Sequence, residues 1–204
     1  MSGTSAYAFD SASEHAGGRF DALQTCYDPV TFARLADLGV TPGMRCLDVA
    51  YDPYGAVRRL AALDRMVRAL RPGGRLVLDE FDCAWVPVLS APSPGAATLF
   101  ETVHDALIDL LTRAGADPRW GLRTYGALRA AGLTDVASAT WAGAWPGGGA
   151  GVRLHAVNVR QVRDRLVAEC GVPDADIDEF LRLLDDPAFA VNSYPLISTW
   201  GTRP

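Results

Sequence analysis

The chain has 204 residues, of which 49% are hydrophobic and 21% are charged, and its formal net charge is −5. These values predict one soluble globular domain with enough apolar side chains for a hydrophobic core. They argue against a nucleic-acid-binding surface, because phosphate binding requires a basic patch.

No stretch of the sequence is apolar over the length that a membrane-spanning helix needs, and the N-terminal segment lacks the basic and apolar regions of a secretion signal. The four cysteines form no Cys-x-x-Cys pair, which predicts reduced, buried thiols rather than a disulfide framework or a zinc site. We therefore expect a cytoplasmic protein that binds neither membranes nor metals.

The first predicted helix begins in "DPVTFARLADLGV", residues 28–40. Asp28 suits the N-cap, Pro29 suits the first turn, and Gly39 suits the position at which a helix ends. The next apolar run, "MRCLDVA" at 44–50, is short and carries an acid near its end. It predicts a buried parallel strand.

A second helix is predicted over residues 56–70, because apolar residues recur there at three- and four-residue spacing with arginines on the opposite side. The Pro-Gly-Gly turn at 72–74 ends this helix, and "RLVLDEF" at 75–81 predicts a second buried strand. The alternation continues and predicts an α/β sandwich. Beyond residue 81 the predicted elements are, in chain order, a loop at 86–95, a helix at 99–111, a helix at 121–132, a strand at 134–141, a flexible connection at 146–151, helices at 152–171 and 175–186, and a strand at 193–201.

Four segments carry a resemblance to a known family: "GVTPGMRCLDVA" at 39–50, "ALDRMVRALRPGGRLVLDEFD" at 62–82, "LRAAGLTDV" at 128–136 and "STWGTRP" at 198–204. Together they resemble the class I S-adenosylmethionine-dependent methyltransferases, most closely those that act on small molecules in bacterial metabolism. The most specific piece is the helix followed by Leu-x-Pro-Gly-Gly, which the family places just before the fifth strand of its sheet. The resemblance implies an α/β fold with helices around a mainly parallel, Rossmann-like sheet.

The resemblance also implies an internal deletion. Only "YDPYGAV", residues 51–57, separates the end of the first motif from the helix before the fifth strand. One βαβ unit takes about 30 residues, so this gap cannot hold the intervening strands. We therefore expect a single domain, 1–204, with a truncated three-layer sandwich that lacks several strands. Its parts would be a helical arm at 1–40, a remnant of the cofactor-binding core at 41–82 and the acceptor side at 83–204.

The resemblance implies S-adenosyl-L-methionine as cofactor, held by Asp48, Ala50, Asp52 and Gly55. Asp48 belongs to the first motif, and Gly55 stands where the family has a glycine-rich loop. Close approach of a nucleotide to backbone favours glycine and a helix N-terminus, and the acid that binds the ribose falls in the deletion. The alternative for Asp48 is an acid that caps the turn after a strand.

On the acceptor side, Glu80, Asp82 and Trp85 follow the predicted fifth strand, where open α/β sheets bind ligands. His104 can serve as the base that deprotonates an acceptor hydroxyl or amine, because histidine titrates near neutrality. The alternatives are solvated carboxylates at Glu80 and Asp82, a packed tryptophan and a histidine of the core. Tyr7 and Arg19 of the arm would contact the ligand or only pack.

The expected function is methyl transfer from S-adenosylmethionine to a small-molecule acceptor, weakened by the missing glycine loop and ribose-binding strand. The alternatives are a non-catalytic binding or partner protein, a repurposed cofactor-independent enzyme, and a gene copy without function. Lost strands would leave an exposed sheet edge. This edge predicts a homodimer or pairing with an intact relative, and no nucleic-acid or membrane partner.

Overall fold

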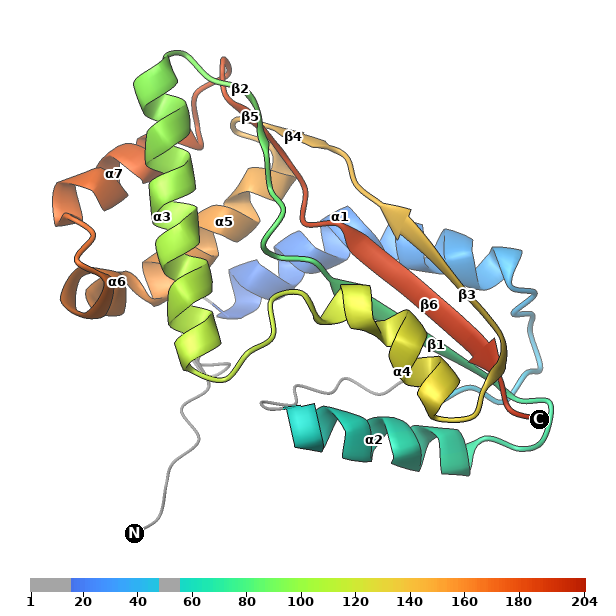
Figure 1. Ribbon diagram of the computed structural model, residues 1–204. Helices are drawn as coiled ribbons and strands as arrows, with labels where there is room; N and C mark the ends of the chain where they lie inside the picture. The colour runs from blue at the N-terminus through green and yellow to red at the C-terminus, as the bar shows by residue number, and fades with distance from the viewer. Residues whose placement is uncertain (1–15, 48–55) are drawn as a thin grey trace, which may run out of the picture.

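The computed structural model describes residues 16–47 and 56–204, and Figure 1 shows how their helices and strands are arranged. The α/β class that the sequence predicts is confirmed. No helix in these two ranges combines the length and the apolar character needed to cross a membrane. In chain order the elements are α1 (Ala16–Asp37), α2 (Ala56–Ala69), β1 (Arg75–Phe81), β2 (Val88–Ser90), α3 (Pro94–Arg113), the 3₁₀ turn η1 (Trp120–Arg123), α4 (Thr124–Ala130), β3 (Thr134–Trp141), β4 (Ala144–Pro146), α5 (Ala150–Gln161), α6 (Arg163–Cys170), α7 (Asp174–Leu183), β5 (Ala190–Asn192) and β6 (Leu196–Thr202).

The strands of the described residues form two antiparallel sheets, ordered β1-β6-β3 and β2-β5-β4. In the larger sheet, β6 lies between β1 and β3 and runs antiparallel to both, with Arg75 opposite Thr202 and Phe81 opposite Leu196. The predicted mainly parallel sheet is therefore wrong for this part of the chain. β1 and β3 do run in the same direction, and the reversed strand β6 separates them.

The predicted strand at 44–50 is wrong over its described residues, 44–47, which have no strand structure. Leu47 is 81% exposed, and Met44 is exposed as well. An apolar run becomes a buried strand only when neighbouring strands pair with it and a helix covers it. In the described residues β1 pairs with β6 alone, so the run has no strand beside it there.

Helix α1 runs straight through Pro29, so the predicted helix start at Asp28 is wrong. Tertiary packing outweighs the local signal, because α1 lies along the sheet and α5, and its Tyr27 ring contacts Phe81 at 4.8 Å between centroids. The predicted end at Gly39 is confirmed. Gly39 has a φ of 80°, and the Val40 amide donates to the Leu35 carbonyl over 3.0 Å, as in a Schellman cap.

The larger sheet lies between two helical layers (Figure 1). On one face, Thr31 of α1 donates a hydrogen bond to Asp79 of β1. On the other face, Leu63 of α2 and Leu128 of α4 belong to a small buried cluster against which Leu76 and Leu78 of β1 pack. Successive side chains of β1 thus point to opposite faces, as the pleat of a strand requires.

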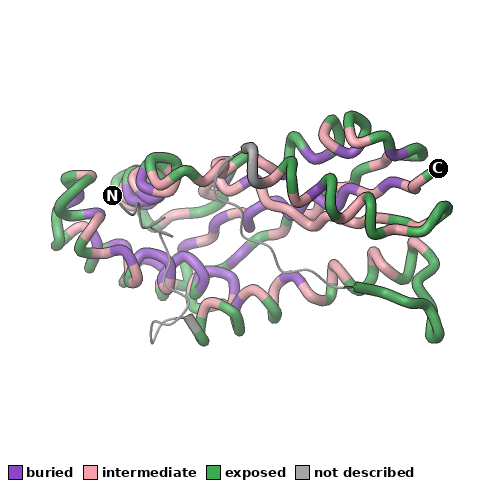
Figure 2. Tube along the Cα trace, turned by 90° about the horizontal axis from the view of Figure 1, so that it is seen from below, coloured by how far each residue is buried: buried purple, intermediate pink, exposed green. Residues whose placement is uncertain are grey.

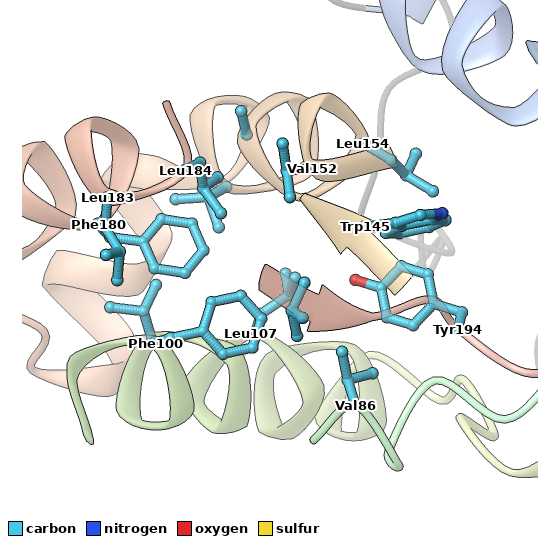
Figure 3. Packing of buried hydrophobic residues seen from close by; sticks show 14 of the residues in the cluster. Val86, Phe100, Leu107, Trp145, Val152, Leu154, Phe180, Leu183, Leu184 and Tyr194 are labelled. Carbon is cyan, nitrogen blue, oxygen red and sulfur yellow. The ribbon is translucent and has the colours of Figure 1, made fainter. Parts of the chain in front are cut away.

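The main hydrophobic core lies on the other side of the molecule, where α3, α5, α6 and α7 pack around the small sheet. Phe100 of α3 and Phe180 of α7 face each other across this core (Figure 3), and their rings stack at 5.5 Å. Figure 2 shows the buried positions gathered in this half and along the sheet, while exposed positions dominate the opposite end.

The glycine-rich segment at 146–151 is a fixed turn, so the predicted flexible connection is wrong. Its Gly147 amide donates to the Phe189 carbonyl over 2.8 Å, and the Gly148 amide donates to the Leu184 carbonyl over 2.8 Å. At Gly151, a Cβ atom would come within 2.1 Å of the Trp145 ring. Glycine is needed at Gly151 for close approach, and the turn joins β4 to α5.

Candidate ligand-binding site

A pocket of about 260 Å³ lies between α3 and the loop that follows β1. It contains two residues that the sequence singles out for the acceptor side, Trp85 and His104. Because the loop begins where β1 ends, the pocket lies at the carboxyl end of that strand. We call it the α3 pocket, and its walls are Ala84, Trp85, Val86, Pro87, Phe100, Glu101, His104 and Asp105.

Local sequence fixes both walls of the pocket. Helix α3 begins at Pro94 after Ser93, whose hydroxyl oxygen accepts a hydrogen bond from the Ala96 amide over 3.1 Å. On the other wall, the Asp82 carboxylate accepts from the Ala84 amide over 3.0 Å, and the Cys83 amide donates to the Pro118 carbonyl over 2.7 Å. The pocket therefore opens between a capped helix and a hydrogen-bonded loop.

His104 is only 4% exposed, and its Nε2 lies 3.0 Å from the Cys83 carbonyl oxygen. A carbonyl oxygen can only accept, so Nε2 carries the proton and donates. Burial lowers the pKa of His104 below its usual value, which keeps the ring neutral. Nδ1 is then an acceptor, and it is buried without a partner among the described residues.

Behind His104, three buried side chains from α5 and the approach to β6 form a hydrogen-bonded group. We call His104, His155, Asn158 and Tyr194 together the tyrosine–histidine cluster. The Tyr194 hydroxyl, which points into the core in Figure 3, lies 3.0 Å from His155 Nδ1 and also bonds the Asn158 side chain. The ring centroids of His104 and His155 are 5.8 Å apart.

Two buried atoms of this cluster have no partner among the described residues, Asn158 Oδ1 and His155 Nε2. Because Asn158 Oδ1 is unpartnered, the Asn158 side chain bonds the Tyr194 hydroxyl through its NH₂ group. Burial lowers the pKa of His155 well below its usual value, which keeps the ring neutral. Buried polar atoms of this kind normally bind water or ligand.

The sequence does not single out His155, Asn158 or Tyr194 as site residues. His155 and Asn158 share a face of α5 with buried apolar residues, which is the usual pattern of a core helix. Tyr194 stands 39 positions after His155. The one local signal is that two residues with polar side chains occupy the apolar face of one helix.

The other predicted acceptor-side residues lie near the pocket but do not line it. Asp82 is buried and caps its own loop, as the hydrogen bond to the Ala84 amide shows. Glu80 is half-buried on β1, opposite Ile197. Arg19 of α1 acts electrostatically on Tyr194 and Cys83, although burial is the larger effect on both. Burial, with the charges of Asp82 and Glu80, raises the pKa of Cys83 to about 12, so its thiol stays protonated.

The residues that the resemblance assigns to S-adenosylmethionine, Asp48, Ala50, Asp52 and Gly55, lie outside the described residues, as does Tyr7. Residues 44–47, which precede them, form no strand. The described residues also contain no group of three or more His, Cys, Asp or Glu side chains placed to hold a metal ion.

No protein-family model matches the chain, and no curated protein matches it significantly. The class of the protein is therefore argued from its own residues and geometry.

Proposed function

We propose that the protein binds a small molecule in the α3 pocket, on a scaffold that corresponds to the acceptor-binding half of a class I methyltransferase. The observation that carries the proposal is the α3 pocket itself, a hollow of about 260 Å³ whose walls combine the apolar side chains of Val86 and Phe100 with the neutral imidazole of His104. Ligand sites are typically apolar hollows with a few placed polar groups.

The order of the larger sheet supports the methyltransferase descent. The segment that resembles the family's helix and fifth strand folds as helix α2 followed by strand β1, which lies in one sheet with β6 and β3. The Leu-Arg-Pro-Gly-Gly turn directly precedes β1, with Gly73 at a φ of 74°. A side chain on Gly74 would meet the Arg71 carbonyl oxygen at 2.8 Å.

Methyl transfer is the second candidate function. One observation favours it: His104, a neutral imidazole of the type that serves as a general base, lines the pocket. The residues predicted to hold the cofactor lie outside the described residues. A product assay with and without S-adenosylmethionine separates the two candidates, because binding alone gives no methylated product.

A second chain at the open edge of β1 is part of the same proposal. In the described residues β1 pairs on one side only, with β6. Open edges are covered in most proteins because their amides and carbonyls can pair with other strands. We propose that a second copy or an intact relative pairs there, and sedimentation of a monomer at micromolar concentration would contradict pairing with a second copy.

The binding proposal is tested by screening small apolar-polar compounds by ligand-observed NMR against the native chain and two variants. Ala84→Phe fills the pocket, while Ala130→Phe adds the same ring on an exposed position of α4. We expect bound compounds to be lost with Ala84→Phe and kept with Ala130→Phe. Failure of every compound to bind, or binding that Ala84→Phe leaves unchanged, would end the proposal.

The cofactor is tested separately by calorimetry. We expect no heat of binding with S-adenosylmethionine at about 1 mM, the concentration at which even weak sites with a Kd near 1 mM are half-filled. Saturable binding by the monomer would restore methyl transfer as the leading function.

A further inference from the structure

We propose that the open edge of β1 pairs with the same edge of a second copy, antiparallel and about a two-fold axis at Val77. This pairing rests on the partner proposed above for the open edge, and it names that partner and its register. Three features lead to it: the direction of the backbone groups of β1, two charged side chains without a counter-ion, and the symmetry of the strand's own sequence.

Alternate residues of β1 turn their backbone groups away from β6. At the two ends of the pairing, the Arg203 amide donates to the Gly74 carbonyl over 2.8 Å, and the Asp82 amide donates to the Pro195 carbonyl over 3.1 Å. The register between these bonds is unbroken, so even-numbered residues bond β6 and odd-numbered residues point to the other side. The open edge therefore consists of the N–H and C=O groups of Arg75, Val77 and Asp79.

Strand β1 lacks cover along this edge. Helix α1 packs on one of its faces, and α2 with α4 packs on the other. No residue of β1 is fully buried, whereas most residues of β6, which has a strand on each side, are buried. A further strand beside β1 would cover the half-buried Leu76, Val77 and Leu78 in the same way.

Arg75 and Asp79 lie on the same face of β1, because side chains four residues apart in a strand point the same way. Asp79 is half-buried; its Oδ2 accepts from Thr31, and its Oδ1 has no hydrogen-bond partner among the described residues. Arg75 is exposed and donates to the Leu38 carbonyl. In the described part of the chain neither charge has a counter-ion. They cannot pair with each other within one strand, because four residues span about 13 Å.

A second copy brings these two charges together. Two-fold pairing sets residue i opposite residue j and residue j opposite residue i. With the axis at Val77, Arg75 of each copy lies opposite Asp79 of the other, with Cβ atoms about 5 Å apart. The same register sets Leu76 opposite Leu78, and Glu80 opposite Gly74, which has no side chain. The interface then has apolar pairs at its centre and an ion pair toward each end.

Other positions of the axis lose this match. An axis at Leu78 would set Val77 opposite Asp79 and Leu76 opposite Glu80, so that each acid meets an apolar side chain. An axis at Asp79 would set the two copies of this acid opposite each other, which is repulsive. Because β1 complements its own sequence about Val77, the charges favour a second copy over a different chain.

Sedimentation velocity on the native chain should show a dimer at micromolar concentration. Arg75→Glu and Asp79→Lys each turn two attractive pairs into two repulsive ones, so each should raise the dimer Kd at least about tenfold. Arg129→Glu is the control. It makes the same charge change on an exposed position of α4, which contacts β3 and β6, and it should leave the Kd within about twofold.

Mixing the two charge variants gives the sharpest test of the register. A heterodimer of Arg75→Glu with Asp79→Lys again has opposite charges at both ends of the interface. Its Kd should therefore return to within about threefold of the native value. Circular dichroism confirms that each variant is folded.

Cross-linking tests the register without any change of charge. The exposed thiol is first removed by Cys46→Ser. Val77→Cys then places two thiols at the axis, where opposite Cα atoms are about 5.5 Å apart and within reach of a disulfide. Leu78→Cys is the matched control, because its two copies lie on a diagonal of about 7–8 Å. Oxidation should link the first variant into a dimer and leave the second unlinked on a non-reducing gel.

The outcomes separate the proposals. A native chain that sediments as a monomer at micromolar concentration would overturn the inference. A dimer that Arg75→Glu does not weaken, or that cross-links through Leu78→Cys instead of Val77→Cys, would overturn the register while copies still pair. Ligand binding in the α3 pocket is decided independently by the compound screen with Ala84→Phe.

Discussion

The two ends of the molecule differ in how far their side chains are buried in a hydrophobic core. Around α3, α5 and α7, large side chains such as Phe100 and Phe180 are fully buried, and the main core extends to β5 and β6. Residues 41–47 are all exposed, and at α2 the buried cluster has only Leu63, Leu128 and Leu133 as fully buried members, with Met66, Val67 and Leu70 partly buried against it.

This difference teaches which half of the fold is self-sufficient. A helix or strand is stable when its apolar face packs on another element. Helices α3, α5, α6 and α7 and strand β6 have such partners within the chain. Residues 44–47 would need a strand beside β1 to be buried, and the described residues offer none. The predictions below compare the two ends, from the largest expected effect to the smallest.

Removing an aromatic ring should be costly at one end and nearly free at the other. Phe180→Ala leaves a cavity beside Phe100 and should lower the free energy of unfolding by about 3–5 kcal/mol. Phe32 of α1 is 64% exposed, so Phe32→Ala should change it by less than about 0.5 kcal/mol. Urea unfolding measures both, and similar losses would show that the two ends are equally packed.

Adding one methyl group gives a finer contrast between two glycines. Gly151→Ala would place a Cβ atom 2.1 Å from the Trp145 ring, and such overpacking should cost about 1–3 kcal/mol. Gly126 lies in α4, and nothing lies within 4 Å of a Cβ there. Gly126→Ala should therefore raise stability by about 0.5–1 kcal/mol. Thermal unfolding measures both, and a tolerated Gly151→Ala would contradict the close contact at the glycine-rich turn.

The tyrosine–histidine cluster should make stability fall with acid. The pKa values of His104 and His155 are lowered in the folded protein, so the unfolded chain binds protons more strongly below its histidine pKa near 6.5. Stability should be constant above this pH and fall below it by up to about 1.4 kcal/mol per pH unit for each histidine.

Urea midpoints between about pH 7.5 and 5.5 measure this fall while most carboxylates stay ionised. His104→Gln should reduce the slope of the free energy of unfolding against pH by the contribution of one histidine. A flat profile in the native chain would mean that the imidazoles are not buried as neutral rings.

The smallest effect is expected at Leu47. Because Leu47 is exposed, Leu47→Asp should change the free energy of unfolding by no more than about 0.5 kcal/mol. The same substitution in a buried strand would cost several times as much. Chemical denaturation distinguishes an exposed Leu47 from a buried one. A large loss in the free energy of unfolding would mean that residues 44–47 are buried.

Local pattern was enough to predict most elements of this fold. The spacing of apolar residues gave α2 and α3, and Gly39, Gly73 and Gly132 mark turns with positive φ where the sequence placed the ends of helices. Strand direction was not predictable in this way, because β6 pairs with β1 and β3 from more than 50 residues away. Pro29 misled for a related reason: the packing of α1 is not visible in its own sequence.

In the candidate site, too, some residues stand out in the sequence and others are brought together only by the tertiary structure. Trp85 and His104 stand out in the sequence, because one follows a predicted strand and the other interrupts an apolar helix face. The functional roles of Trp85 and His104 remain predictions. Tyr194 and Asn158 become visible only when β6 brings the segment before it against α5, where Tyr194 meets His155. A hydrogen-bonded cluster assembled across such distances has no signature in a single sequence.

Hydrogen exchange on the whole chain tests the central claim most directly, namely that stability resides in the half that contains the main hydrophobic core. Amides of β6 and of the buried turns of α3 and α5 should exchange only through global unfolding, because their hydrogen bonds lie in the main core. Amides of residues 41–47 should exchange many orders of magnitude faster, and S-adenosylmethionine should leave them unchanged. Protection of residues 41–47 equal to that of β6 would contradict the account.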